Sequence, residues 1–90
     1  DNDFPALSAE APEPANADAL FRAEPVSGAC RVVCFSPDHG ATLPELGLDA
    51  VKAVVACWRA EAAALEKRHP CVQVFENKGE MMGCSNPHPH

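Results

Sequence analysis

The sequence of 90 residues has no apolar run that approaches the roughly 18–20 residues needed to span a membrane. Its first five residues lack the basic segment and the following apolar stretch that are typical of a signal peptide. The chain also does not begin with methionine, so we expect a processed chain or a piece of a longer protein. We predict a cytoplasmic protein with no membrane partner.

Basic residues are few: the sequence has 7 lysines and arginines against 13 aspartates and glutamates, a formal net charge of -6. A surface of that sign repels the phosphates of nucleic acids and the headgroups of anionic lipids. We therefore expect no nucleic acid as the main partner. A small nucleotide stays compatible with this composition, because it needs only a few local hydrogen-bond donors.

A regular disulfide framework is also lacking, because the five cysteines are an odd number with unequal spacing. Cys57 and Cys71 lie in apolar, periodic surroundings and are predicted to be small core residues. Cys30 and Cys34 do not form a CxxC motif, and we do not expect them to bind metal. This usage of cysteine favours a reducing compartment.

The elements that the sequence does predict are few, and ninety residues allow one small domain at most. Residues 8–29 are predicted to be mostly loop, rich in proline, alanine and acidic residues at the start. The segments CRVVCF at 30–35 and CVQVFE at 71–76 are predicted strands. Apolar residues at helical spacing predict an amphipathic helix over about 48–68. Two strands and one helix do not close a core, which favours a fragment of a larger α+β domain.

The last eight residues, GCSNPHPH, place two histidines two positions apart. Alternate residues of an extended backbone point to the same face, so His88 and His90 are predicted to lie side by side. Pro87 and Pro89 remove two backbone donors, which suits a site better than a central strand. Either both histidines bind one metal, or one binds a metal and the other is a nucleophile. A flexible tail, or the remainder of an expression tag, is the simpler alternative.

The residues before the histidines favour a site for phosphate. Met82–Asn86 contain a glycine and small polar side chains, which let a phosphate approach the backbone. Ser85 can donate a hydrogen bond to it. Nucleotidyl transfer needs mostly positioning and charge stabilisation, and such residues can supply both.

Several motifs together resemble the galactose-1-phosphate uridylyltransferase family, a branch of the histidine-triad superfamily. The resemblance covers nearly the whole chain outside the 8–29 region, and the motifs that carry it follow one another in the family's order: DNDFPAL, CFSPDH, TLPEL, FENKG and MMGCSNPHPH. It implies a partial N-terminal nucleotide-binding domain over 1–90, truncated at both ends. The implied fold is α+β, with an antiparallel sheet and the helix at about 48–68 packed on it.

The resemblance also implies a double displacement in galactose metabolism, the Leloir pathway. His90 would attack the α-phosphorus of UDP-glucose, glucose 1-phosphate would leave, and a covalent uridylyl-histidine would form. Galactose 1-phosphate would then take the uridylyl group. The parent protein would be a homodimer.

The family pattern assigns roles to individual positions of this chain. His90 would be the nucleophile, with Ser85 near the leaving oxygen. His88 would bind zinc, its backbone carbonyl would orient the His90 ring, and His39 would be a second zinc ligand. The positions implied to bind UDP-glucose, through the uridine or the phosphates, are Asn2, Asp3, Phe4, Asn77, Gly83, Cys84 and Ser85.

Other parts of the family pattern are missing from these ninety residues. They include a glutamine two positions after the nucleophile, two cysteine ligands of the zinc, and the half of the protein that holds the hexose phosphate. We therefore expect the isolated piece to be inactive. Three alternatives stay open: another histidine-triad nucleotide hydrolase or phosphorylase, a zinc-binding module using His39, His88, His90 and a cysteine, and a structural fragment without activity.

Overall fold

The computed structural model describes residues 3–16 and 18–90, and Asn2, a predicted uridine contact, lies outside these ranges. The chain divides into two compact units, Asp1–Val32 and Val33–His90. Within the described ranges, no helix has both the length and the apolar character that crossing a membrane requires.

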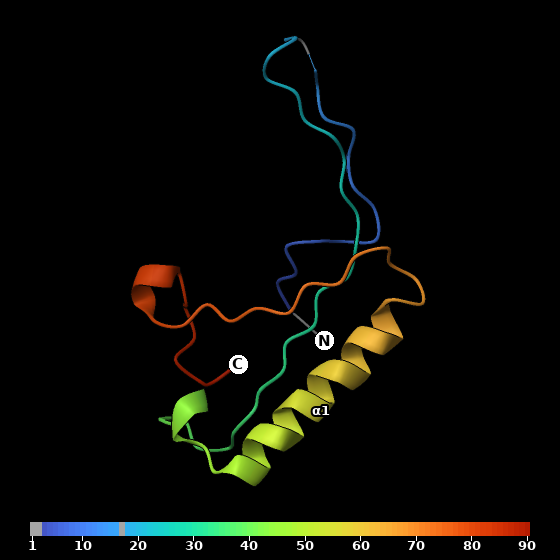
Figure 1. The fold of residues 1–90 in the computed structure, drawn as a ribbon. Coiled ribbons are helices and arrows are strands. Elements are labelled where there is room, and N and C mark those ends of the chain that lie inside the picture. The colour runs from blue at the N-terminus through green and yellow to red at the C-terminus, as the bar shows by residue number, and fades with distance from the viewer. Residues whose placement is uncertain (1–2, 17) are drawn as a thin grey trace. The chain divides into compact units, whose positions relative to one another are not determined.

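The predicted antiparallel sheet, and with it the predicted α+β class, is wrong. The segments 30–35 and 71–76 are not strands, and the described ranges contain no other strand. The regular elements in these ranges are all helical (Figure 1). A strand needs a second strand whose amides and carbonyls pair with it in a regular ladder. The Phe35 amide donates to the Pro89 carbonyl oxygen at 3.4 Å. Pro89 has no amide hydrogen to continue a ladder at that point.

The second expected strand also lacks a buried face. Val74 is 53 % exposed and its neighbour Phe75 is 70 % exposed, so the alternation of 71–76 does not separate an inner from an outer side. Alternation stabilises a strand only when one face is covered by other elements. The segment 71–76 is irregular in this structure for that reason.

The expected helix is present as α1, Leu48–Leu65, three residues shorter than predicted. Gly47 is the N-cap, and its carbonyl accepts from the Val51 amide at 3.1 Å. After Leu65 the chain makes one tight turn, in which the amides of Arg68 and His69 both donate to the Leu65 carbonyl. Pro70 then follows, and a proline cannot continue a helix.

One face of α1 carries the buried apolar residues of the second unit. Val54 is 6 % exposed, while Val51, Trp58 and Leu65 on the same stripe are half-buried. Their spacing of three, four and seven residues places them on one side of a helix with 3.6 residues per turn. Among the described residues only Val54 and Pro89 are buried, so this core is small.

The first unit is organised by turns. The Gly28 amide donates to the Ser8 carbonyl at 2.8 Å. Farther out, the Asn16 side chain donates to the Ala23 carbonyl and accepts from the Ala23 amide, both at 2.8 Å. An amide side chain used in this way replaces one rung of a hairpin. The described part of the 8–29 segment contains neither helix nor strand, and its two arms run side by side in Figure 1.

Candidate active site

His39 and His88 meet although 49 positions separate them in the chain. Their Nδ1 atoms are 3.1 Å apart, and the ring centroids are 5.3 Å apart with the planes tilted by 33°. One neutral imidazole can donate to the other at that distance. Two unprotonated Nδ1 atoms can instead face one cation. The arrangement therefore serves either as a hydrogen-bonded pair or as half of a metal site.

The loop that presents His39 is closed by side chains next to it. The Ser36 hydroxyl accepts from the Asp38 amide at 3.1 Å, and the Asp38 carboxylate accepts from the Gly40 amide at 3.0 Å. Each is a turn in which a side-chain oxygen bonds the amide two residues ahead. These turns fix the backbone on both sides of His39.

A short 3₁₀ helix, η1 at Leu43–Glu45, follows the His39 loop. The Glu45 carboxylate accepts from the Thr42 amide at 3.0 Å and from the Thr42 hydroxyl at 2.6 Å. The hydroxyl bond is the larger cause, and together with the amide bond it lowers the pKa of Glu45 below its ordinary value. A carboxylate is therefore held charged at the start of this turn.

The C-terminal stretch fixes the ring of His90. Its Nδ1 lies 2.7 Å from the His88 carbonyl oxygen, so Nδ1–H is the donor. That tautomer leaves the lone pair on Nε2, so this nitrogen is free to bind a metal or to act as a nucleophile. His90 itself is half-buried, and the preceding Pro89 is buried. The contact that the family pattern implied between these two residues is thus present in the structure.

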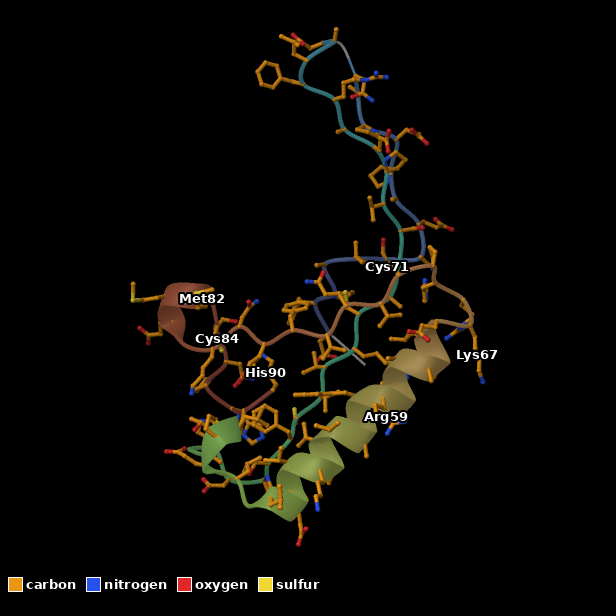
Figure 2. All side chains as sticks on the ribbon, viewed as in Figure 1. Arg59, Lys67, Cys71, Met82, Cys84 and His90 are labelled. Atoms are coloured by element: carbon orange, nitrogen blue, oxygen red, sulfur yellow. The ribbon has the colours of Figure 1, made fainter. Side chains whose placement is uncertain are left out.

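The chain reaches the histidines through a second 3₁₀ turn, η2 at Glu80–Met82, bounded by two glycines. Gly79 has φ +86° and Gly83 has φ +80°, which side chains with a Cβ rarely adopt. The Cys84 amide donates to the Gly79 carbonyl at 3.2 Å. The Cys84 thiol donates to the Asn86 carbonyl at 3.0 Å, and Figure 2 shows Cys84 and His90 on this last stretch.

The predicted substrate-binding residues fall into both units. Asp3 and Phe4 belong to the first unit and are exposed, Phe4 by 92 %. Asn77 and Ser85 are exposed in the second unit, as is Gly83. The structure gathers His39, His88 and His90, with Cys84 connected to them through Asn86.

Asn86 is a residue of this site for which no separate role was predicted from the sequence. Its Oδ1 accepts from the His88 amide at 3.0 Å, in the same kind of turn that Ser36 makes with Asp38. The signal was available: an asparagine before a proline often closes such a turn. The Asn86 side chain thus holds the backbone at His88.

The pair of His39 and His88 fits zinc as two of its ligands. Zinc binds imidazole nitrogens at about 2.0–2.1 Å in a tetrahedron, which places neighbouring ligand atoms about 3.3–3.4 Å apart. The observed separation of 3.1 Å is close to that value. In the part of the chain that the structure describes, no group of three or more histidines, cysteines or acidic residues is placed to hold a metal. A zinc module formed by these residues alone would need at least three ligands.

Comparison with known proteins gives consistent results. The whole chain, residues 1–90, matches the family model for the N-terminal domain of galactose-1-phosphate uridyl transferase. A rat protein named galactose-1-phosphate uridylyltransferase is 50 % identical over 100 % of this chain and 24 % of its own length. Proteins of the same name from Haemophilus influenzae and Schizosaccharomyces pombe are 47 % and 37 % identical over 99 % of the chain. They are covered over 26 % and 29 % of their own length, so the chain spans about a quarter of these relatives.

Proposed function

Because the chain belongs to the galactose-1-phosphate uridyl transferase family, as its motifs predicted, we propose that it is part of a nucleotidyltransferase of galactose metabolism. The proposed reaction transfers a uridylyl group from UDP-glucose to galactose 1-phosphate. The ninety residues would supply part of the N-terminal, nucleotide-binding domain of a longer enzyme. The names of the relatives and the match over the whole chain support this proposal.

One observation carries the chemistry: the His90 Nδ1–H donates to the His88 carbonyl at 2.7 Å. A histidine nucleophile needs an unprotonated Nε2 and an imidazole ring whose orientation is fixed. The carbonyl supplies both, because it accepts a hydrogen bond from Nδ1–H and so leaves Nε2 unprotonated. It also faces the side of the ring where positive charge develops when Nε2 bonds to phosphorus.

In the proposed first step, the Nε2 lone pair forms a bond to the α-phosphorus of UDP-glucose. The bond from that phosphorus to the bridging oxygen breaks, and glucose 1-phosphate leaves with the electron pair. In the second step, a phosphate oxygen of galactose 1-phosphate attacks the same phosphorus. The N–P bond breaks, UDP-galactose is released, and the imidazole is neutral again. Splitting one transfer into two lets a single site serve both sugar phosphates.

The remaining proposed roles follow the family pattern. Ser85 would donate its hydroxyl proton as a hydrogen bond to the leaving oxygen, and it is exposed as that role requires. The proposed contacts to the nucleotide are Asn77, Gly83 and Cys84 for the phosphates, and Asn2, Asp3 and Phe4 for the uridine. We also propose that the full-length protein is a homodimer.

His39 and His88 would hold zinc, since their Nδ1 separation suits two of its ligands. Bound there, a zinc ion would act as a structural link between two loops. What this chain contributes is the position of His88. Its ring faces His39 while its carbonyl faces the His90 ring, so one residue connects the two functions.

The test uses the full-length protein that contains these ninety residues, incubated with UDP-glucose alone and weighed intact by mass spectrometry. We expect a uridylyl adduct that maps to His90 and disappears when galactose 1-phosphate is added. His90→Asn should abolish it. His69→Asn, a matched change next to the end of α1, should not. The ninety residues alone should show no turnover.

Three results would count against the proposal. A folded wild-type protein that forms no adduct would remove His90 as the nucleophile. An adduct on another residue would do the same. An adduct that decays to UMP in water, at the same rate with and without galactose 1-phosphate, would favour a nucleotide hydrolase.

A further inference from the structure

Asn86 controls the amide of His88. The stretch 87–89 contains two prolines, so the His88 amide is the only backbone donor in it. The Asn86 side chain accepts from that donor through Oδ1 at 3.0 Å. The backbone of Asn86 is itself held, because the Cys84 thiol donates to its carbonyl at 3.0 Å. A local chain of hydrogen bonds thus runs from Cys84 to His88.

This contact bears on the direction of the His88 carbonyl. The hydrogen bond to Asn86 holds the plane of the Pro87–His88 peptide, from which the backbone rotations of His88 start. The rotation ψ is restricted by the following Pro89, because the proline ring clashes with alternatives to an extended backbone. The Pro89 carbonyl in turn accepts from the Phe35 amide at 3.4 Å. With the preceding peptide plane held and ψ restricted, the His88 carbonyl has few directions open to it.

We propose that Asn86 is a positioning residue for His90: it holds the His88 peptide so that the carbonyl of His88 can fix the tautomer and the direction of the His90 ring. This inference rests on the proposed role of His90 as nucleophile. In this role Asn86 acts on His90 through the His88 peptide. Without Oδ1, the His88 peptide turns more freely, the carbonyl spreads over several directions, and Nε2 is aimed less well at phosphorus.

The chain offers its own conservative replacement. Ser36 stands before a proline and accepts from the Asp38 amide at 3.1 Å, in the geometry that Asn86 shows with His88. Serine therefore closes this turn in the same protein. Asn86→Ser should keep the acceptor, while Asn86→Ala removes it. Asn86→Gln keeps the amide but displaces its oxygen by one methylene.

The experiment measures the single-turnover rate of adduct formation in the full-length protein at increasing UDP-glucose. Asn86→Ala should lower the maximal rate roughly ten-fold, a size that misplacement of a nucleophile by a fraction of an ångström produces. The half-saturating concentration of UDP-glucose should not change, because the defect lies in orientation. Asn86→Ser should recover most of the rate and Asn86→Gln should not.

Asn16→Ala is the matched control. It also removes an asparagine that bonds the backbone, and it loses two hydrogen bonds where Asn86→Ala loses one. If general destabilisation were the cause, Asn16→Ala should slow adduct formation at least as much. We expect it to leave the rate unchanged.

A spectroscopic readout separates positioning from stability. Nitrogen-15 spectra of the histidine rings report whether His90 carries its proton on Nδ1 or on Nε2. Asn86→Ala should raise the Nε2–H population of His90, and Asn86→Ser should not. If Asn86→Ala does not fold, the rate and the His90 tautomer are compared between Asn86→Gln and Asn86→Ser instead.

The outcomes are distinguishable. If Asn86→Ala forms the adduct at the wild-type rate and keeps the wild-type tautomer of His90, the positioning role of Asn86 is overturned. The role of His90 as nucleophile is not affected by that result. An equal loss in Asn16→Ala would also overturn it. A folded wild-type protein without any adduct would overturn the proposed function, and the role of Asn86 would fall with it.

Discussion

Helix α1 and the two loops that present the histidines are stabilised in opposite ways. From Val51 onward the amides of α1 donate to carbonyls four residues back, so the helix satisfies most of its own backbone. The loops around His39 and His88 have no such repeat. Single side chains hold them instead, each through an amide two residues ahead. The helix is thus a cooperative element, while the site depends on a few individual atoms.

The difference shows where substitutions should matter. A cooperative helix spreads the effect of a surface change over many bonds, and only a change that breaks its repeat is severe. In a loop closed by one acceptor, the loss of that acceptor frees the backbone next to a functional side chain. Helix substitutions should therefore affect mainly the free energy of unfolding. Loop substitutions should affect mainly the chemistry.

Proline in the middle of α1 should give the largest loss of stability. Ala56 is exposed and central in the helix, so Ala56→Pro removes a backbone bond and adds a clash without disturbing the core. We expect a loss of about 3 kcal/mol in the free energy of unfolding. Denaturant titration of the full-length protein measures it. Ala15→Pro, in a loop that already holds prolines, is the control, and an equal loss there would contradict the cooperative view of α1.

A second prediction concerns the glycine that precedes the site. Gly83 has φ +80° and no atom within 4 Å of a built Cβ, so Gly83→Ala meets backbone strain without a steric clash. That strain costs about 1–2 kcal/mol. Because the turn can relieve it by moving Cys84–His90, we also expect slower adduct formation.

Gly40→Ala is the control for that substitution. A Cβ at position 40 would lie 3.7 Å from the Asp38 carboxylate, an ordinary contact, and its backbone does not need a positive φ. Unfolding curves of the two variants should separate them by about 1 kcal/mol. Equal curves would show that the left-handed conformation of Gly83 carries no cost.

The same contrast explains what the sequence predicts well. Helix α1 is encoded locally, in the spacing of Val51, Val54 and Trp58, and it forms three residues shorter than expected. The family is encoded in long motifs, and it is confirmed over the whole chain. Both signals lie within contiguous stretches of residues.

The prediction of a sheet was wrong because strands are not encoded locally. CRVVCF and CVQVFE have the composition of strands, but a strand exists only when another segment pairs with it. The same limit applies to the site. The meeting of His39 with His88 joins distant segments, and their residue types alone do not reveal it; the family pattern, in which both bind zinc, is what implied it. The role of Asn86 was local and could have been predicted from the Asn-Pro pair.

The smallest expected effect is a pH dependence at Glu45. Hydrogen bonds from the Thr42 hydroxyl and amide lower the pKa of this carboxyl below its ordinary 4.5. A group whose pKa is lowered on folding contributes stability above its unfolded value and loses it as pH falls through the folded value. The contribution should therefore be present at neutral pH and disappear below about pH 4.5. Carbon-13 titration of the Glu45 carboxyl measures this directly.

Thr42→Val should return the pKa of Glu45 toward its ordinary value, because it removes the hydroxyl that is the largest cause of the shift. Thr42→Ser keeps a hydroxyl and should keep the lowered pKa. The change in unfolding free energy should be slight, since Glu45 is exposed and solvent weakens its interactions. An unchanged pKa in Thr42→Val would show that the turn before α1 is held by its backbone alone. That turn would then be stabilised by backbone hydrogen bonds, as the helix is, and not by a single side chain, as the loops of the histidine site are.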